Sequence, residues 1–249
     1  MSAGLRESGD GDGVARLTFD RPERLNAFRG SDYRDLRVAI ERARSDASVR
    51  VILLTGSGRA FSAGADRSLL NGTAPAVDRQ LASTEFSAML EAFGRCDKPI
   101  VAAVNGLAVG VGCTILLHCD LVLVAASARL RLPFTALGIV PEAGSSALLP
   151  ARARWGDAVW AMLSSEWIDA QSALTMGLAW RVVGAEDLLA EASAAAATIA
   201  ALDPDAVAAT KRLLTAGRAD LVRAAMDREL VEMSALVRDP GPGAAEPGI

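Results

Sequence analysis

The feature that most constrains the fold is a series of apolar runs, each of which ends at small or turn-forming residues. They are "VRVILLTGSG" (49–58), "IVAAVNG" (100–106) and "DLVLVAA" (120–126). Strands with consecutive apolar residues are buried on both faces, as in a parallel sheet that is covered by helices. Segments with helical periodicity separate the runs, and the sequence therefore predicts an α/β layered core.

Further elements extend this pattern toward both ends of the chain. "GVARLTFD" (13–20) alternates as a half-buried strand does. "SDYRDLRVAIERARSD" (31–46) follows with apolar residues at helical spacing and begins with a serine that is suited to cap a helix. From about Trp155 onward the pattern is helical. Strands are therefore expected first and helices last.

The same pattern sets the expected domain organisation. We expect the core over residues 13–150 and a helical C-terminal region over residues 151–238, which would cover a site or pack against other subunits. Residues 1–12 are acidic and rich in glycine, and residues 239–249 are rich in proline and glycine. Both ends are therefore predicted to be flexible tails.

The composition argues against several classes of function. A net charge of −4 gives no electrostatic sign of binding to nucleic acid or to an anionic membrane. Three irregularly spaced cysteines and a single histidine argue against a disulfide framework and against a zinc site, and they fit a reducing cytosol. The first residues lack the apolar core of a signal peptide. We therefore expect a cytoplasmic protein without a bound metal.

One apolar segment is roughly long enough to span a bilayer. Residues 99–117 carry no charged side chain. The Asn105-Gly106 pair is, however, a strong turn signal within this segment, and a buried strand followed by a buried helix explains it better. The sequence therefore predicts no membrane span.

Three glycine-rich turns follow predicted strands. They are "TGSGRAFSAGAD" (55–66), "NGLAVGVGC" (105–113) and "LGIVPEAGSS" (137–146). Glycine lets the backbone approach a ligand closely and adopt positive φ, so that N–H groups can face a substrate. A helix that begins directly after such a turn adds the positive end of its dipole. Two converging turns would form an oxyanion hole, which is a pair of backbone donors directed at one substrate oxygen.

Each turn alone has other interpretations, of which a tight connection in an α/β protein is the simplest. A dinucleotide site is disfavoured because "GSGRAF" and "GVGCTI" lack the third glycine of that fingerprint. A hydrolytic triad of His118 and Asp120 with Ser145 or Ser146 is disfavoured because "GSS" lacks the pattern of a nucleophile elbow. His118 ends an apolar helical segment, and we expect it to pack in the core.

The third turn places a single carboxylate, Glu142, among small and apolar residues. No lysine, arginine or histidine occurs between Phe134 and Pro150. An acid in such surroundings is either a turn residue directed at water or a group whose pKa is raised for catalysis.

Five sequence blocks, in their order and spacing, resemble the crotonase superfamily of enoyl-CoA hydratases and isomerases. The blocks are "RPERLNA", "VRVILLTGSGRAFSAGAD", "KPIVAAVNGLAVGVG", "CDLVLVA" and "LGIVPEAGSS". The resemblance runs from about Gly13 to Leu213. It implies a spiral of ββα units, a homotrimer or a dimer of trimers, and an acyl-CoA thioester as substrate. It implies no cofactor other than the CoA that belongs to the substrate.

The resemblance also assigns roles to individual residues. In this family two backbone N–H groups polarise the thioester carbonyl, and the matching positions here are Ala65 and Val111. The family holds the CoA moiety chiefly through backbone groups, and Arg24, Ala63 and Asp66 occupy the corresponding positions. Asp66 has a second interpretation of equal weight, as the N-cap of the segment that follows it.

Two departures from the family pattern bear on the reaction. Enoyl-CoA hydratases use two glutamates to position and deprotonate water, and the matching positions in the substrate site are Thr114 and Phe134. A hydroxyl and a phenyl ring do not perform this two-carboxylate chemistry. Efficient hydration is therefore not expected.

The block "LGIVPEAGSS" resembles instead the monofunctional Δ3,Δ2-enoyl-CoA isomerases, in which its glutamate, here Glu142, is the single acid and base. The resemblance implies that this carboxylate removes a C2 proton from a 3-enoyl thioester, that the oxyanion hole holds the dienolate, and that the proton returns at C4. Two alternatives stay open. One is a hydratase-like or other crotonase reaction on a CoA thioester, and the other is a catalytically silent acyl-CoA-binding subunit.

Overall fold

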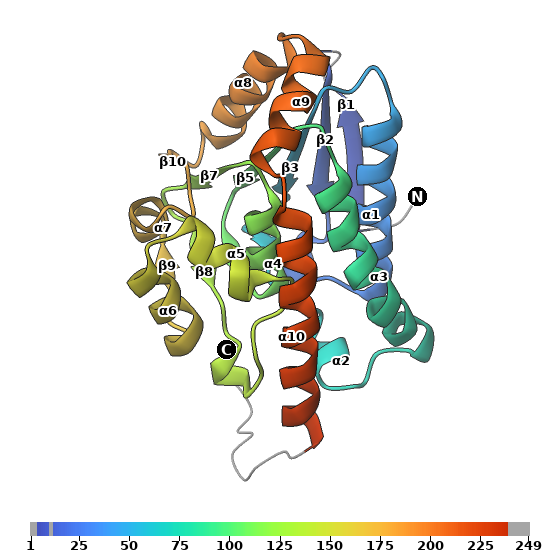
Figure 1. Cartoon of the computed structure of the whole chain (residues 1–249), viewed down its shortest axis with the longest axis vertical. Helices are drawn as coiled ribbons and strands as arrows, with labels where there is room; N and C mark the ends of the chain where they lie inside the picture. Colours follow the sequence, from blue (N-terminus) through green and yellow to red (C-terminus); the bar gives the residue numbers. More distant parts are fainter. Residues whose placement is uncertain (1–3, 10–11, 239–249) are drawn as a thin grey trace.

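Two β-sheets form the centre of the molecule, and helices surround them (Figure 1). The computed structural model describes residues 4–9 and 12–238 of the 249-residue chain. The larger sheet has six strands in the order β1-β2-β3-β5-β7-β10, and all neighbours are parallel except β1 and β2. Its strands are β1 (Leu5–Gly9), β2 (Val14–Phe19), β3 (Val51–Gly56), β5 (Ile100–Val104), β7 (Leu121–Ala125) and β10 (Arg181–Val183).

The smaller sheet has four strands in the order β4-β6-β8-β9, of which only β9 runs antiparallel to its neighbour. Its strands are β4 (Ala60–Ser62), β6 (Leu107–Val109), β8 (Arg129–Arg131) and β9 (Ile168–Asp169). From β3 to β8, each successive pair of strands places its first member in the larger sheet and its second in the smaller one. The predicted α/β spiral of ββα units is therefore confirmed.

Helices cover the sheets and make up most of the C-terminal region. The helices of the first half are η1 (Pro22–Arg24), α1 (Gly30–Ser45), α2 (Arg67–Leu70), α3 (Ala76–Arg95), α4 (Val111–Thr114) and η2 (Ile115–His118). Those of the second half are η3 (Thr135–Leu137), α5 (Ser145–Arg152), α6 (Trp155–Ser164), α7 (Ala170–Met176), α8 (Leu188–Ala200), α9 (Pro204–Leu214) and α10 (Arg218–Arg238). The long helix α10 crosses in front of α4 and α5 and packs against α5 (Figure 1).

The three apolar runs form the central strands of the larger sheet, as predicted. All residues of β5 are buried, as are residues 51–54 of β3. The helix α8 packs against β3 and β5, while α1 and α3 pack against one another. Because consecutive residues of these strands are buried, both of their faces are removed from water, which explains why the runs show no polar alternation.

Three predictions about the elements need correction. Residues 5–9 were expected in a flexible tail but form β1, which pairs with β2 through an antiparallel ladder. Residues 151–238 are not wholly helical, because β9 and β10 extend the two sheets. Helix α1 begins at Gly30, and its N-cap residue is Arg29, whose backbone N–H donates to the Asp32 carboxylate at 2.8 Å, so Ser31 is not the N-cap. The predicted tail over residues 239–249 lies outside the described residues.

The apolar segment 99–117 is divided by a turn, as the Asn105-Gly106 pair predicts. It forms β5, the short strand β6, and the helices α4 and η2. Within residues 4–9 and 12–238, no helix combines the length and the apolar character that crossing a bilayer requires. The predicted single strand and helix are in fact two strands and two short helices, because the chain passes from one sheet to the other after Asn105.

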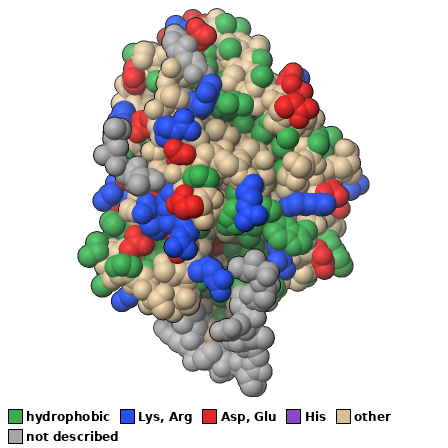
Figure 2. All heavy atoms as spheres, turned by 180° about the vertical axis from the view of Figure 1, so that it is seen from behind, with side chains coloured by type: hydrophobic (Ala, Val, Ile, Leu, Met, Phe, Trp, Pro, Cys, Tyr) green, Lys and Arg blue, Asp and Glu red, His purple; other side chains and the backbone are tan. Residues whose placement is uncertain are grey.

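The surface facing the viewer in Figure 2 carries charged side chains of both signs. Lys and Arg side chains gather across its middle, with Asp and Glu side chains among them and apolar side chains between. Neither sign therefore covers this face alone. That the chain does not bind nucleic acid stays a prediction from its net charge of −4.

Candidate active site

Ala65 lies in the turn after β4. An isolated parallel β-bridge pairs this turn with Phe28. The Phe28 N–H donates to the Gly64 carbonyl at 2.7 Å, and the Asp66 N–H donates to the Phe28 carbonyl at 2.8 Å. In a parallel bridge of this kind the N–H of the central residue points away from its partner. Among the described residues, the Ala65 N–H accordingly has no acceptor.

Val111 is the first residue of α4. It follows Gly110, whose backbone conformation favours glycine. Gly110 has φ +53° and ψ −125°, and its carbonyl accepts hydrogen bonds from the Cys113 and Thr114 N–H groups at 2.8 and 2.9 Å. The Val111 N–H belongs to the first turn of the helix and has no intrahelical partner. It is a second backbone donor without an acceptor in the described part of the chain.

The two turns pack backbone against backbone. A Cβ atom added to Gly64, which has φ +91°, would lie 2.6 Å from the Val109 carbonyl oxygen. A Cβ atom added to Gly112 would lie 2.4 Å from the Ser62 carbonyl oxygen. Only glycine permits this approach at both positions. The structure thus brings the turns of Ala65 and Val111 together, as the oxyanion-hole hypothesis requires.

Glu142 lies in the segment between η3 and α5, and it meets the second turn through Thr114. The fully buried Thr114, at the end of α4, donates a hydrogen bond from Oγ1 to Glu142 Oε1 at 2.9 Å. The Glu142 residue is only partly exposed to solvent. The sequence allows Glu142 to be either a turn residue directed at water or a group held within the protein. The structure favours the second interpretation.

The surroundings raise the pKa of Glu142 to about 7. Burial is the main cause, because the protein around the carboxyl replaces water that would stabilise its charged form. The negative charge of Glu229 also raises the pKa of Glu142, whereas the hydrogen bond from Thr114 lowers it. Near neutral pH the carboxyl group therefore exists in both protonation states, as a general acid and base requires.

The residues that replace the two hydratase glutamates have different positions. Thr114 contacts Glu142 directly, as described above, whereas Phe134 is a buried residue at the start of η3. The Phe134 carbonyl accepts the Ile139 N–H at 2.9 Å, which closes the turn that leads toward Glu142. Among the described residues, Thr114 is thus joined to the candidate acid by a hydrogen bond, but Phe134 is not.

The segments predicted to hold CoA lie next to the Ala65 turn. The Ala63 N–H donates to the Leu25 carbonyl at 2.9 Å, so Ala63 is adjacent to the turn that contains the exposed Arg24. Asp66 caps α2 by accepting the Ser68 N–H at 3.1 Å, which confirms its N-cap interpretation. That Arg24, Ala63 and Asp66 contact CoA stays a prediction.

Two buried groups that sequence reasoning did not assign to the site hold the turn after Glu142. The Glu229 carboxylate of α10 accepts the Gly144 N–H at 2.8 Å and the Ser146 N–H at 2.9 Å. His118 Nε2 donates to the Ala143 carbonyl at 2.9 Å, since a carbonyl oxygen is only an acceptor. A signal for Glu229 exists in the sequence, because this acid interrupts an apolar stripe at helical spacing that includes Val222 and Met226.

His118 is neutral and packed in the core, as the sequence predicts. Burial lowers the pKa of His118 to about 4, and the positive charge of Arg218 acts in the same direction. The ring therefore places no positive charge beside the Glu142 turn at neutral pH. His118 and Ser145 form no hydrogen bond with each other within the described chain, so the structure does not assemble the triad considered above.

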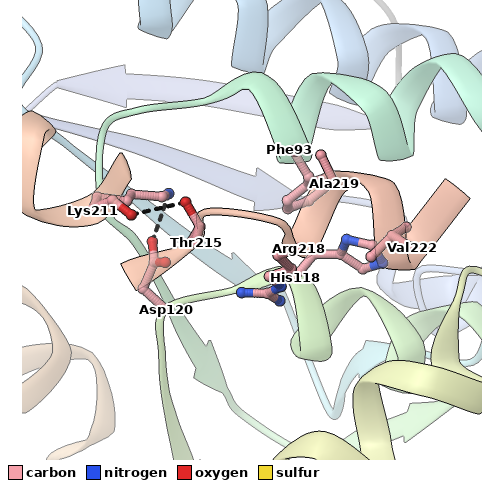
Figure 3. Close-up of a pocket in the computed structure, with 9 residues that line it drawn as sticks. Phe93, His118, Asp120, Lys211, Thr215, Arg218, Ala219 and Val222 are labelled. Atoms are coloured by element: carbon pink, nitrogen blue, oxygen red, sulfur yellow. Dashed lines mark hydrogen bonds and ion pairs between the residues drawn. The ribbon is translucent and has the colours of Figure 1, made fainter. Parts of the chain in front are cut away.

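A small cavity lies between α9, α10 and the core, and the His118 ring is part of its lining (Figure 3). Its volume of about 50 Å³ suits a few water molecules and is far below that of a ligand pocket. At one end Lys211 forms an ion pair of 2.7 Å with Asp120, and at the other Arg218 donates to the Leu117 carbonyl. These contacts attach the last two helices to the core, and the cavity between them is too small for an acyl-CoA.

Comparison with known proteins agrees with this arrangement. The family model described as "Enoyl-CoA hydratase/isomerase" matches residues 9–235. A protein of Rhodobacter capsulatus named "Probable enoyl-CoA hydratase" is 38% identical over 207 residues, which are 83% of this chain and 79% of that protein. The "1,2-epoxyphenylacetyl-CoA isomerase" of Escherichia coli is 36% identical over 179 residues, which are 71% of this chain and 68% of that protein.

Solved structures show the same fold. The crystal structure of an enoyl-CoA hydratase/isomerase from Pseudoalteromonas atlantica has a TM-score of 0.87 and 38% sequence identity. The match covers 95% of this chain and 92% of the other. The similarity therefore extends through the core sheets and into the C-terminal helices.

Proposed function

This chain belongs to the enoyl-CoA hydratase/isomerase family, and on that premise we propose that it moves the double bond of a 3-enoyl-CoA thioester to the trans-2 position. The observation that carries this proposal is the state of Glu142. Its carboxyl has a pKa raised to about 7, and the hydrogen bond from Thr114 holds it at the end of α4. A single acid of this kind suffices for isomerisation.

In the proposed reaction, Glu142 and the two free N–H groups have complementary roles. The Glu142 carboxylate takes the proton from C2 of the 3-enoyl thioester, and the electrons of that C–H bond form a dienolate. The Ala65 and Val111 N–H groups stabilise the negative charge on the thioester oxygen. The protonated Glu142 then returns the proton to C4, which leaves the double bond between C2 and C3. No proton is gained or lost overall.

The surroundings of Glu142 support isomerisation over hydration in two ways. Thr114 and Phe134 provide no second carboxylate that would position and deprotonate water. The partial burial of Glu142 also limits access of water to the dienolate. The acid is thus suited to move a proton between two carbons of one substrate.

Hydration of a 2-enoyl-CoA is the second candidate function. What favours it is the similarity to the Rhodobacter capsulatus protein, which is 38% identical to this chain and is named a probable enoyl-CoA hydratase. In that reaction a single carboxylate, Glu142, would deliver the elements of water across the double bond. The absence of an acid at Thr114 and Phe134 predicts that this activity is slow.

An assay with two substrates distinguishes these functions. Isomerisation predicts that 3-enoyl-CoA is converted to trans-2-enoyl-CoA and that added 2-enoyl-CoA gains no water. Glu142→Gln should lower kcat by several orders of magnitude and leave the dissociation constant of an acyl-CoA nearly unchanged. The exposed Glu186→Gln is the matched control and should retain full activity. Binding without turnover of either substrate would instead favour a silent acyl-CoA-binding subunit and would refute the proposal.

We further propose that copies of the chain associate, as the family resemblance implies for a trimer or a dimer of trimers. Several large apolar side chains of α6 and the segment after it are exposed, and monomers rarely expose groups of this size together. They are Trp155, Trp160, Leu163 and Trp167. Light scattering after size exclusion gives the number of copies, and a monomer at micromolar concentration would contradict the proposal. The cytoplasmic location and the absence of a cofactor beyond CoA also remain proposals.

A further inference from the structure

The segment after Glu142 adopts a backbone conformation that needs external support. Ala143 has φ +63° and the next residue, Gly144, has φ +68°. For an alanine this left-handed conformation costs about 1–2 kcal/mol, because Cβ approaches the following carbonyl oxygen. Two consecutive residues of this kind define the direction in which the Glu142 side chain leaves the backbone. What holds them therefore holds the candidate acid.

Glu229 supplies much of this support from α10. Its two carboxylate oxygens accept the N–H groups of Gly144 and Ser146, one each. These donors begin α5, which has no cap from its own side chains. Gly144 also lies directly against α10, because an added Cβ atom would be 2.9 Å from Val222 Cγ1. Glu229 thus caps α5, which is distant from it in the sequence, and fixes the turn that carries Glu142.

The same carboxylate brings a negative charge close to Glu142. Glu229 is 8% exposed and makes no ion pair within the described chain, so water and cations screen its charge poorly. The other titratable groups around this turn are Tyr33 of α1 and His118 of η2, with Arg218 next to His118. Tyr33 and His118 are neutral at pH 7, because burial raises the pKa of Tyr33 and lowers that of His118.

We infer that Glu229 is a positioning residue for Glu142, which fixes the turn that carries the acid and holds a negative charge beside it. This inference rests on the proposed role of Glu142 as acid and base. Because a negative neighbour disfavours a second negative charge, removing it should lower the pKa of Glu142. Because the turn would lose one of its anchors, removal should also displace the carboxylate and lower kcat.

The test compares Glu229→Gln, which has nearly the same shape, with Glu229→Asp, which keeps the charge. The exposed Glu232→Gln, on the same helix, is the matched control. For Glu229→Gln we expect kcat to fall by about tenfold to a hundredfold, with a smaller change in KM, because small displacements at a reacting centre have effects of this size. We also expect the acidic limb of the rate profile to move to lower pH. Glu229→Asp should keep that limb near its wild-type position.

A second measurement does not depend on turnover. The carboxyl carbon of Glu142, assigned by its loss in Glu142→Gln, is titrated by ¹³C NMR in each variant. The pKa of Glu142 should fall in Glu229→Gln and stay near the wild-type value in Glu229→Asp and in Glu232→Gln. If Glu229→Gln does not fold, Glu229→Asp decides the question. Its kcat should be lower than that of the wild type, while the pKa of Glu142 should be unchanged.

The outcomes separate this inference from the proposed function. If the wild type converts no 3-enoyl-CoA but the Glu142 titration moves in Glu229→Gln, the isomerase proposal fails and the influence of Glu229 on Glu142 stands. If Glu142→Gln is inactive but Glu229→Gln has wild-type kcat and an unchanged Glu142 titration, the inference about Glu229 is overturned. In Glu229→Asp, a wild-type kcat would overturn the positioning role in the same way.

Discussion

Thr114 donates its hydroxyl to the Glu142 carboxylate at 2.9 Å, and Thr114 occupies the position that the family resemblance matches to one of the two hydratase glutamates. A hydroxyl at this place stabilises the charged form of its neighbour, whereas a second carboxylate would repel it. The pair of Thr114 and Glu142 is therefore suited to a reaction in which Glu142 is the single acid and base. This relationship makes the protonation state of Glu142 the quantity that most directly tests the site.

The pH dependence of the reaction is the first prediction. The base must be deprotonated to take the C2 proton, and the pKa of Glu142 is raised to about 7. We therefore expect kcat/KM for 3-enoyl-CoA to rise with pH through about 7 and to level off above it. Initial rates across the stable pH range provide the measurement. A flat profile between about pH 5 and 8 would show that the base has an ordinary carboxyl pKa.

Replacing Thr114 should shift this profile. Its hydrogen bond lowers the pKa of Glu142, so Thr114→Val, which keeps the shape but removes the donor, should raise that pKa further. The rate should then fall by about tenfold near pH 6 and by less at high pH, where the base is deprotonated in both proteins. Thr114→Ser keeps the hydroxyl and serves as the control. Equal losses at both pH values would instead indicate a change of shape alone.

Gly64→Ala should damage both the oxyanion hole and the fold. The new Cβ atom would lie 2.6 Å from the Val109 carbonyl oxygen, in a residue with φ +91°. We expect a loss of about 1–3 kcal/mol in the free energy of unfolding, together with a larger fractional loss of activity. Gly94→Ala in α3 meets no atom within 4 Å and should be neutral or stabilising. Urea unfolding and the isomerase assay measure the two effects, and a Gly64→Ala protein with normal values in both would contradict this account of the turns.

The raised pKa of Glu142 has a cost in stability that depends on pH. The folded protein binds a proton at this site up to about pH 7, whereas an unfolded chain releases it near the ordinary value of 4.5. Between these two values the free energy of unfolding contributed by this group falls as pH rises. Glu142→Gln lacks this titration, so its stability relative to the wild type should increase by about 1–3 kcal/mol from pH 4 to pH 8. Urea midpoints at both pH values measure the difference, and a constant difference would place the carboxyl in water.

The sequence was most informative about those parts of the fold in which a short local pattern, such as an apolar run or a glycine-rich turn, is required for burial or close packing. The apolar runs of β3 and β5 predict strands covered on both faces. The glycine-rich segments that follow them, 55–66 and 105–113, predict close backbone approach, which the structure shows at Gly64 and Gly112, although these segments also contain the unpredicted strands β4 and β6. The resemblance in five blocks then places Glu142 near these turns. These features depend on residues that are close in the sequence, or on motifs with fixed spacing.

The features that were missed depend on contacts between distant segments. The strands β1 and β10 have few residues, and they are strands because a neighbour of the larger sheet offers free hydrogen-bonding groups, which their own composition does not reveal. Glu229 is recognisable as an acid on the apolar side of a helix, but its partners are backbone N–H groups that carry no sequence signature. The sequence alone therefore identifies the candidate acid and leaves out the group that holds it.

The capping of α5 by Glu229 also has a consequence for biosynthesis. The strands β2 to β7 and both oxyanion-hole turns lie within residues 14–125, whereas Glu229 is carried by α10, the last helix of the described residues. A chain in synthesis that has not yet placed α10 against α5 lacks the Glu229 anchor of the segment that bears Glu142. By the argument given for Glu229→Gln, a chain without this anchor would turn over a thioester about tenfold to a hundredfold more slowly than the folded protein.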